Sequence, residues 1–344
     1  MTKLSIIIKT FNEEANIARA IESALAVAAA YSGEVIVADS KSTDGTIEVA
    51  CRYPVRVVQI RNSRERCCGI GPELGLQHSL GEFVLLMDGD MDLVPAFVDK
   101  AMTMLDADPG LAGVGGFIRE MRSSNLQFKG RARRLKAQET QPARATDALS
   151  GGGLYRRSAL ESVGYMSDRN LHAYEEFDLG RRLLKKDWRL VHVPDHSADH
   201  YSYDLGTLAL LMHRLRSGSM LGQGEMLRAA IYSGYTDAAL QVNAVRISIG
   251  LLASWFCVFV ALIAGVSAWL VGLATLGGLA GIIALMAVKH RSLASALHSV
   301  LVWHVAAGGM ILGALRRRRP PRSPIDSTII RDTGNILSKA VVNG

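Results

Sequence analysis

Cysteine is scarce in this sequence: the 344 residues include four, and none has the spacing of a metal-ligand pair. This excludes a disulfide-rich secreted scaffold and a structural zinc domain, and we read the four cysteines as reduced thiols. Internal repeats and low-complexity tracts are also missing, which argues against a solenoid or a fibrous chain. No secretory signal opens the sequence, because the run at 4–8 is too short and too β-branched for one. We therefore expect the N-terminal part to stay in the cytosol.

Charge is absent from one long stretch. Residues 247–288 contain no Asp, Glu, Lys, Arg or His, which leaves room for two membrane spans of about 20 residues each. A further apolar segment, 293–315, is interrupted only by two histidines. We therefore predict a soluble domain over 1–240, a membrane segment over 246–315 and a basic C-terminal tail over 316–344. A hydrophobic hairpin inside a soluble core is the alternative, and so long an uncharged run disfavours it.

The net charge of +7 is concentrated in two basic blocks, 129–136 and 316–319. Nucleic acid is one partner for such blocks, but beside apolar spans an anionic lipid surface is the better match. We therefore expect the chain to bind an anionic lipid membrane and no nucleic acid. For the first block, an ordinary solvated surface stays an alternative.

Strand-like and helix-like runs alternate in the first half of the chain with short connections. This alternation is typical of an α/β fold with a mostly parallel sheet flanked by helices, in which binding sites lie at the carboxyl ends of the strands. The strands are expected over 4–8, 34–38, 55–60, 83–87, 111–118 and 190–193, the last one ending at Pro194. The helices are expected over 13–28, 44–51, 73–79 and 175–186.

The most informative stretch is a buried-strand pattern that ends in two carboxylates, Asp88-Gly89-Asp90. Neighbouring carboxylates are costly to desolvate without a cation, and a hard divalent ion that also bridges to a substrate phosphate is the usual solution. A plain Asp-Gly turn after a strand is the alternative, and for this motif alone it is an equally good interpretation.

Three other turns also carry carboxylates, at 10–13, 39–45 and 175–178. The first two follow strands of the same predicted sheet as the 88–90 turn, so all three turns should converge at one edge of that sheet. An acidic crevice repels phosphates unless a metal intervenes. The pattern therefore predicts a metal–diphosphate complex at this edge.

The motifs, taken in order, resemble a known family. They read IIKTFNEE, VADSKSTDGT, LLMDGD, GGGLYRR and EEFDLGRRL, and they extend over about residues 3–205. This series is similar to that of the family 2 glycosyltransferases, which have the GT-A fold. The resemblance implies a nucleotide-diphosphate sugar donor, Mg²⁺ or Mn²⁺ as cofactor, and inversion at the anomeric carbon.

The resemblance also implies roles for individual residues. The positions that contact the nucleoside of the donor are Thr10, Asn12, Glu13 and Asp39. Asp88 and Asp90 match the Asp-x-Asp pair that holds the metal and the donor, with Asp90 as the more direct metal ligand. His200 lies where many members have a histidine that reaches the metal or the diphosphate, and His196 competes with it for that place.

For the catalytic base, the resemblance points to the start of the last predicted helix. Glu176 falls where the family usually has an aspartate, and its extra methylene leaves Glu175 and Asp178 as alternatives. A carboxylate deprotonates an acceptor hydroxyl from about 3 Å, and an adjacent carboxylate raises its pKa. The alternative is that these acidic residues only cap the helix.

Two features depart from the family pattern or extend it. Members often carry Ala-Arg-Asn-x-Gly before the strand that ends at Asp88, whereas here Pro72 and Glu73 replace the Arg and Asn. We expect Arg64 or Arg66 to supply the missing positive charge. The glycine-rich loop at 151–153 is expected to form a wall of the acceptor site, unless it is a plain turn.

The apolar segment is flanked by basic residues, Arg246 on one side and Lys289-His290-Arg291 on the other. Two spans return the chain to the cytosol at Lys289, as the positive-inside rule favours, whereas a third full span would place 316–319 outside. We therefore expect two spans and a re-entrant or in-plane segment at 293–315. This makes the protein a multi-pass protein of the cell inner membrane with a cytoplasmic catalytic domain.

These inferences predict a membrane-anchored, metal-dependent, inverting glycosyltransferase of cell-envelope or exopolysaccharide assembly. The resemblance implies a polyprenyl-linked or other saccharide acceptor. A sugar-nucleotide nucleotidyltransferase is a weaker alternative, because no glycine-rich phosphate loop follows the first strand. The other alternative is a catalytically degenerate GT-A membrane scaffold, because the changes at Pro72 and Glu73 are compatible with a loss of activity.

Overall fold

The computed structural model describes residues 2–121, 142–149, 151–201 and 206–332. The chain forms two compact units, the first made of Met1–His213 with Arg318–Gly344 and the second of Arg214–Arg317. The basic block at 129–136 and the last twelve residues of the chain lie outside the described residues.

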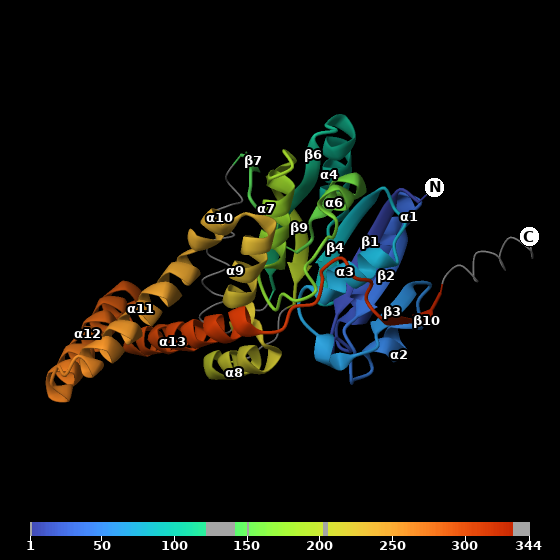
Figure 1. The fold of residues 1–344 in the computed structure, drawn as a ribbon. Helices are drawn as coiled ribbons and strands as arrows, with labels where there is room; N and C mark the ends of the chain where they lie inside the picture. Colours follow the sequence, from blue (N-terminus) through green and yellow to red (C-terminus); the bar gives the residue numbers. More distant parts are fainter. Residues whose placement is uncertain (1, 122–141, 150, 202–205, 333–344) are drawn as a thin grey trace, which may run out of the picture. The chain divides into compact units, whose positions relative to one another are not determined.

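The first unit is built on one mixed sheet with helices on both faces (Figure 1). Its strands, in their order across the sheet, are β10 (Ser327–Arg331), β3 (Arg56–Ile60), β2 (Glu34–Asp39), β1 (Leu4–Thr10), β4 (Phe83–Asp88), β8 (Leu154–Arg156), β6 (Leu111–Glu120), β9 (Arg189–His200) and β5 (Met91–Leu93), and β7 (Arg144–Ala145) pairs with β9. Strands β3, β2, β1 and β4 run parallel to one another, whereas β8 and β10 are antiparallel to their neighbours β4 and β3. The predicted α/β class is confirmed.

Alternating residues of the central strands divide the core into two layers. The helices of this unit are α1 (Ile17–Ala30), α2 (Thr46–Ala50), α3 (Ile70–Gln77), α4 (Pro95–Ala107), α6 (Arg157–Val163) and α7 (Glu175–Leu184). Ile6 and Ile8 share a buried cluster with residues of α1 and α4, whereas Ile7 shares one with α3, α6 and α7. All three side chains are fully buried, as parallel strands covered by helices on both faces require.

The register of β1 brings the polar ends of three strands together. Thr10 lies opposite Asp39 of β2, and Lys9 lies opposite Asp88 of β4. The turns that follow these strands therefore meet at one edge of the sheet, as the sequence predicted.

Strand β9 is longer than the sequence predicted. It continues through Pro194 to His200, and the predicted end at Pro194 was wrong. The register between β9 and β6 shifts between Gly115 and Phe117, opposite this part of β9, which marks a bulge. A bulge tolerates proline because no ladder hydrogen bond from its missing N–H is needed there. The additional residues carry His200 toward the turn after β4.

Helix α3 begins earlier than predicted, at Ile70, and includes Pro72 in its first turn. An N–H in the first turn has no partner within the helix, so proline costs little there. Helix α1 begins later than predicted, because residues 13–16 form a turn closed by the Asn16 N–H bond to the Glu13 carbonyl at 2.9 Å.

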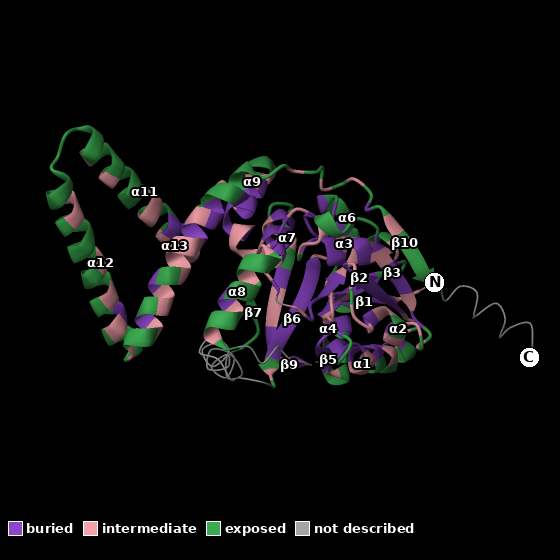
Figure 2. Cartoon of the chain, turned by 90° about the horizontal axis from the view of Figure 1, so that it is seen from below, coloured by how far each residue is buried: buried purple, intermediate pink, exposed green. Residues whose placement is uncertain are grey.

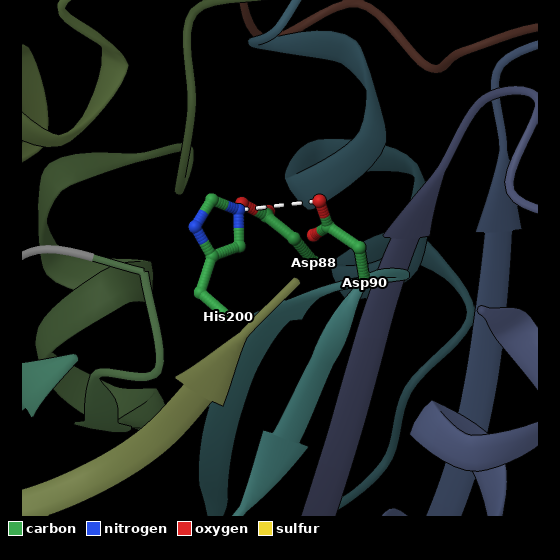
Figure 3. A group of neighbouring side chains, drawn as sticks. All are labelled: Asp88, Asp90 and His200. Atoms are coloured by element: carbon green, nitrogen blue, oxygen red, sulfur yellow. Dashed lines mark ion pairs between the residues drawn. The ribbon is translucent and has the colours of Figure 1, made fainter. Parts of the chain in front are cut away.

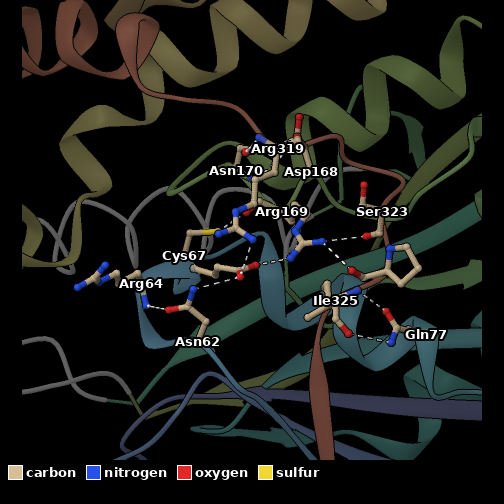
Figure 4. Close-up of polar contacts among 12 residues, drawn as sticks. Asn62, Arg64, Cys67, Gln77, Asp168, Arg169, Asn170, Arg319, Ser323 and Ile325 are labelled. Atoms are coloured by element: carbon tan, nitrogen blue, oxygen red, sulfur yellow. Dashed lines mark hydrogen bonds and ion pairs between the residues drawn. The ribbon is translucent and has the colours of Figure 1, made fainter.

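Residues 318–332, here called the C-terminal strap, belong to the first unit (Figure 4). The strap contributes β10, which extends the sheet at the free edge of β3. Ile325 is 3% exposed, and its backbone exchanges two hydrogen bonds with the Gln77 side chain, at 2.8 and 3.1 Å. The sequence analysis treated this stretch as part of a basic tail, since strand pairing at a distant edge leaves no local signal.

Basic residues of the strap pair with carboxylates of the first unit. Arg319 lies 2.7 Å from Glu65, and Arg318 lies 2.9 Å from Asp168. Arg169 donates to the carbonyls of Ser323 and Pro324 at 2.9 and 3.0 Å. Two of the four arginines of the second basic block therefore pair with carboxylates of the first unit.

We predict that the strap contributes to the stability of the first unit through Ile325. The Ile325→Ala variant should lose about 2–4 kcal/mol of unfolding free energy, because it leaves a cavity in a buried cluster. The matched control is Ile330→Ala in β10, where the side chain is 43% exposed and the expected loss is about 0.5 kcal/mol or less. Chemical denaturation of the detergent-solubilised protein measures both, and equal losses would contradict the packing assigned to the strap.

The second unit contains the long apolar helices. Its helices after α8 (Thr207–Ser217), which joins the units, are α9 (Gly222–Ser233), α10 (Thr236–Leu240), α11 (Asn243–Ile263), α12 (Ala268–His290) and α13 (Leu293–Leu315). Among the described residues, α11, α12 and α13 are each long and apolar enough to cross a membrane. Figure 2 shows α11 and α12 as largely exposed. Exposed apolar helices of this length fit a hydrocarbon environment, as predicted.

Candidate active site

Hydrogen bonds between side chains and backbone join the turns that follow β1 and β2. The Asn12 side-chain oxygen accepts from the Thr43 N–H at 2.8 Å, and the Asn12 N–H donates to the Ser42 hydroxyl at 2.8 Å. The Glu13 N–H donates to the Thr46 hydroxyl at 2.8 Å. Asn12 has a φ of 56°, a conformation that asparagine tolerates better than most residues. The two turns therefore form one interlocked surface.

Asp39 lies fully buried beneath this surface. One of its carboxylate oxygens accepts from the N–H groups of Lys41 and Ser42, both at 2.9 Å, and from the Gln59 amide at 2.8 Å. The neighbouring Thr10 is also buried, and its carbonyl accepts from the Ser40 N–H at 2.9 Å. The structure thus brings the four predicted nucleoside residues, Thr10, Asn12, Glu13 and Asp39, into adjacent turns, with Asp39 shaping its own turn.

Of the two arginines considered for the missing positive charge, Arg66 lies at these turns. Its guanidinium stacks on the Phe11 ring at 3.7 Å from the centroid and donates to the carbonyls of Ser40 and Lys41 at 2.9 and 3.0 Å. Arg64 donates its backbone N–H to the Asn62 side chain. The Arg66 side chain therefore supports the surface made by the first two turns.

Glu73, the residue that departs from the family pattern, holds another loop in place. Its carboxylate accepts from the N–H groups of Met166 and Ser167 at 2.8 and 3.1 Å. Burial raises the pKa of Glu73, although these two hydrogen bonds oppose the shift. The glutamate that replaces the family's asparagine at position 73 therefore holds the 166–167 loop in place through these hydrogen bonds.

Asp88, Asp90 and His200 form a group with the geometry of a metal site (Figure 3). One ligand atom from each lies within 4.8 Å of the other two, and His200 Nε2 is 3.2 Å from Asp90 Oδ2. The antiparallel pairing of β5 with β9 places Met91 opposite His200, and this brings Asp90 beside the imidazole. Two carboxylate oxygens and one imidazole nitrogen are a donor set that suits a divalent cation such as Mn²⁺ or Mg²⁺.

Gly89 allows the two aspartates to approach the first turn. A Cβ at this position would lie 2.9 Å from Thr10 Oγ1 and 3.1 Å from a Glu13 side-chain carbon. The Gly89 N–H donates to the Lys9 carbonyl at 3.0 Å. A side chain here would therefore push the Asp88–Asp90 turn away from the turn after β1.

His200 is held from its other side by Glu120. The imidazole Nδ1 lies 2.8 Å from Glu120 Oε2, and the register of β6 with β9 places these two residues opposite each other. Burial alone would lower the pKa of His200, but the hydrogen bonds that its ring donates to the Asp90 and Glu120 carboxylates outweigh it and raise the pKa to about 10. A metal ion at Nε2 would have to displace that proton, and the carboxylate on Nδ1 would orient the ring for it.

Lys9 lies between the aspartate pair and the start of α7. Its ammonium is 3.0 Å from Asp88 Oδ1 and 3.4 Å from Glu175 Oε1. Burial would lower the pKa of Lys9, but Asp88, Glu175 and Glu176 together raise it well above its ordinary value. The lysine is therefore a fixed positive charge that links the metal-binding turn to the acidic helix start.

Glu176 has the perturbed ionisation expected of a general base. Burial and the adjacent Glu175 raise its pKa to about 7, while Lys9 opposes the shift. Asp178, the third acidic residue of this turn, is fully buried and pairs with Arg182 at 2.8 Å. Of the three carboxylates considered as base, Asp178 is thus committed to an ion pair inside the protein.

His196 lies apart from the metal-binding group. Its ring stacks on Phe117, with centroids 5.3 Å apart, and its Nε2 lies 3.0 Å from Asp199. Within the described residues, the group of candidate ligands contains His200 and excludes His196.

The glycine-rich loop lies beside the strand that ends at Asp88. The Gly152 N–H donates to the Leu86 carbonyl at 2.7 Å, and the Leu86 N–H donates to the Gly153 carbonyl at 3.0 Å. A Cβ on Gly151 would lie 3.8 Å from Asp88 Oδ2. The absence of side chains at this loop therefore keeps the face of Asp88 open.

Comparison with known proteins identifies the family. Residues 5–164, which include the first three turns and the aspartate pair, match the model of Glycosyl transferase family 2. This part of the chain belongs to glycosyltransferase family 2. The match places this region, with its interlocked turns, in the family that the sequence motifs resembled.

Relatives similar to this chain include glycosyltransferase EpsE of Bacillus subtilis (strain 168), which is 27% identical over 198 residues, or 54% of this chain and 68% of the relative. Another is dolichyl N-acetyl-alpha-D-glucosaminyl phosphate 3-beta-D-2,3-diacetamido-2,3-dideoxy-beta-D-glucuronosyltransferase of Methanococcus voltae, 23% identical over 228 residues, or 59% of this chain and 68% of the relative.

Among solved structures, the mannosyltransferase PcManGT of Pyrobaculum calidifontis, in complex with GDP-Man and Mn²⁺, has the same fold. It is 18% identical, with a TM-score of 0.56, and the match covers 90% of this chain and 87% of that one. The likeness confirms the GT-A architecture predicted for the catalytic sheet.

Glu120 and Lys9 belong to the candidate site but were not among the residues predicted from the sequence. Glu120 ends β6, about eighty positions before the histidine it contacts, so only the strand register reveals it. Lys9 did carry a local signal, because a single charge near the end of the apolar run at 4–8 marks a side chain with a specific partner.

We predict that Glu120 contributes to metal affinity. The Glu120→Ala variant should bind Mn²⁺ about 10–100-fold more weakly, because the imidazole of His200 loses the partner that orients it. Glu120→Gln should recover part of the loss, since an amide oxygen can still accept from Nδ1. Calorimetric titration with Mn²⁺ and a nucleoside diphosphate measures both variants, and unchanged affinity in Glu120→Ala would contradict this role.

Proposed function

We propose that this chain is a membrane-anchored, metal-dependent, inverting glycosyltransferase. Its donor would be a nucleotide-diphosphate sugar and its acceptor a lipid-linked or other saccharide of cell-envelope or exopolysaccharide assembly. One observation carries the proposal: the Lys9 ammonium lies 3.0 Å from Asp88 of the metal-binding group and 3.4 Å from Glu175, which is adjacent to Glu176 in the sequence.

The donor would lie along the edge made by the first three turns. The interlocked turns at Asn12 and above Asp39 would receive the nucleoside, and the metal-binding group would receive the diphosphate. A divalent cation held by Asp88, Asp90 and His200 would neutralise the charge that develops on the leaving diphosphate. Mn²⁺ and Mg²⁺ both fit this donor set.

Glu176 would act on the acceptor. Its carboxylate takes the proton of the attacking hydroxyl while that oxygen forms a bond to the anomeric carbon from the face opposite the diphosphate. The bond between the anomeric carbon and the diphosphate oxygen breaks, and its electron pair leaves with the nucleoside diphosphate. The products are the glycosylated acceptor with inverted configuration and a protonated Glu176.

A pKa near 7 suits this role for Glu176. A base whose pKa is close to the working pH is ionised in a useful fraction of molecules and still accepts a proton readily. Lys9 limits how far the pKa rises, because its charge favours the ionised carboxylates on both sides.

The three apolar helices support a membrane-delivered acceptor. The relative from Methanococcus voltae is named for action on a dolichyl-linked saccharide, which is consistent with a polyprenyl-linked acceptor here. We extend the proposal to a catalytic unit on the cytoplasmic side of the inner membrane, where nucleotide sugars are available and anionic lipids attract basic residues.

The proposal is tested by incubating membranes that contain the protein with a panel of nucleotide sugars and Mn²⁺. We expect release of a nucleoside diphosphate together with sugar transfer to lipid. If added pyrophosphate instead converts the nucleotide sugar to a nucleoside triphosphate and a sugar 1-phosphate, the chain is a nucleotidyltransferase. Calorimetric titration of the purified protein with UDP or GDP, each with Mn²⁺, is the second measurement, and a lack of metal-dependent binding to either would indicate a degenerate scaffold.

A further inference from the structure

The connectivity of the two units limits how the chain meets a membrane. The first unit contains Met1–His213 and also Arg318–Gly344, so the chain leaves this unit and later returns to it. The return is a structural part of the fold, because β10 of the strap is hydrogen-bonded to β3 in the central sheet. A folded sheet with helices on both faces does not span hydrocarbon. The segment between the two parts must therefore enter and leave the bilayer on the same side.

This requirement excludes an odd number of crossings. The segment contains three helices of 21, 23 and 23 residues, each with enough apolar length to cross. At 1.5 Å per residue each is about 30–35 Å long, which matches the hydrocarbon thickness of a bilayer. If the protein spans the membrane, two of the three helices cross and one does not.

Helix α13 differs from α11 and α12 in its surroundings. Of its most apolar stretch, 39% is buried inside the protein, against 6% for each of the other two. It packs closely on α9, because a Cβ at Gly224 of α9 would lie 1.9 Å from the Met310 carbonyl oxygen of α13. A Cβ at Gly309 or Gly313 would likewise lie within 2.3 Å of a backbone carbonyl of Met220 or Leu221, in the turn just before α9. Helix α9 carries Glu225 and Arg228, so this partner has the composition of an interfacial helix rather than of a membrane span.

The C-terminal end of α13 lies among charged groups. Arg316 is 3.5 Å from Glu225, whose side chain is fully buried. Arg228 donates to the Ala314 carbonyl at 3.4 Å and to the Arg316 carbonyl. Because burying these charges in hydrocarbon is expensive, this end of α13 belongs at the level of the membrane surface or above it.

The N-terminal end of α13 is tied to a second basic site. Helix α12 ends with Lys289 and His290, and only Arg291 and Ser292 separate it from α13. The turn between α11 and α12, at 264–267, is by contrast uncharged. Basic residues stay on the side from which a segment inserts, whereas an uncharged turn crosses readily.

Resting on the membrane anchoring proposed above, we propose that α11 and α12 cross the bilayer as a hairpin and that α13 lies in the interface on the catalytic side. The apolar face of the hairpin contacts lipid chains, and the basic turn at 289–291 contacts anionic headgroups. The 264–267 turn is then the part of the segment exposed on the far side. A hairpin of α12 and α13 would also cross the bilayer an even number of times. It would, however, place the basic turn at 289–291 on the far side of the membrane.

The experiment uses the full chain with its four native cysteines replaced by serine. Each variant then carries a single cysteine at one chosen position. Ser267→Cys probes the turn between α11 and α12, Ser292→Cys probes the turn between α12 and α13, and a cysteine appended after Gly344 probes the C-terminus. His290→Cys is a second probe of the basic turn, because Ser292 caps α13 through the Ser295 N–H. Leu80→Cys, at a side chain of the first unit that is 70% exposed, marks the catalytic side. Each is treated with a membrane-impermeant maleimide in sealed right-side-out and inverted vesicles, and detergent gives total labelling.

We expect Ser267→Cys to react only from the side opposite that of Leu80→Cys, with complete loss of labelling from the other side. Ser292→Cys, His290→Cys and the C-terminal cysteine should react only from the same side as Leu80→Cys. Labelling of the basic turn from the far side would overturn the proposal in favour of an α12–α13 hairpin. A C-terminus on the far side, or a chain that reacts from one side at every position, would overturn it as well. Labelling reports topology whether or not the chain transfers sugar, so this result is independent of the proposed chemistry.

Discussion

Replacement of Asp90 by alanine should lower sugar transfer by about 1,000-fold or more. The carboxylate is 3.2 Å from His200 and is the best-placed oxygen ligand of the candidate metal site. Its loss removes a ligand from the cation that stabilises charge on the leaving diphosphate, a contribution of about 4 kcal/mol to the barrier. The measurement is the rate of nucleoside diphosphate release in the presence of saturating donor, at a Mn²⁺ concentration that saturates the wild-type protein.

The matched control for this variant is Asp106→Ala. Asp106 lies in α4, outside the metal-binding group, where it is half-exposed and pairs with Lys3 at 3.0 Å. Both variants should fold, because neither removes buried apolar surface, and unchanged circular dichroism verifies this. Raising the Mn²⁺ concentration should partly restore the Asp90→Ala variant if the defect is in metal affinity. Transfer at the wild-type rate in Asp90→Ala would rule out the metal role of this residue.

The Glu176→Gln variant should lose transfer by about 100- to 10,000-fold while it binds donor and Mn²⁺ normally. Glutamine has the shape of glutamate but accepts no proton at neutral pH, and general bases typically contribute this much. Separate measurements of kcat and of the affinity for donor distinguish a lost base from a damaged binding site. Glu175→Gln is the companion variant, since Glu175 is also paired with Lys9 at 3.4 Å.

The pH profile gives the same prediction a second readout. A general base works in its ionised form, so a base with a pKa of about 7 loses activity as the pH falls below 7. The logarithm of kcat/KM should therefore rise with a slope of about one below pH 7 and reach a plateau above it. In Glu176→Gln this rise should be absent. If Glu175→Gln is inactive and Glu176→Gln retains full turnover, the base is Glu175.

The sequence predicted the catalytic sheet well because its signals are local. Apolar runs such as those of β1 and β4 are buried on both faces, and the turns that follow them are polar, so both the strands and the edge with the site follow from short stretches. The three apolar helices were equally visible, because hydrocarbon requires long uncharged runs and little else. The aspartate pair was visible because only Gly89 separates its two members in the sequence.

Residues that meet only through strand pairing were not predictable in the same way. The proline in β9 was read as a stop, since the bulge that accommodates it depends on a neighbouring strand. Glu120 was missed for the same reason, because its partner His200 is distant in sequence. The choice between His196 and His200 also stayed open until the pairing of β5 with β9 placed one of them beside Asp90.

By itself, then, the sequence determined an α/β catalytic domain with an acidic edge and an apolar C-terminal segment. These properties follow from the patterns of single segments, in which burial and charge repeat over a few residues. The tertiary structure alone decided that Lys9 joins the two acidic groups, that Glu120 supports His200, and that the strap returns to the sheet as β10. Each of these is a contact between distant segments, and its free energy appears only when the strand register brings the partners together.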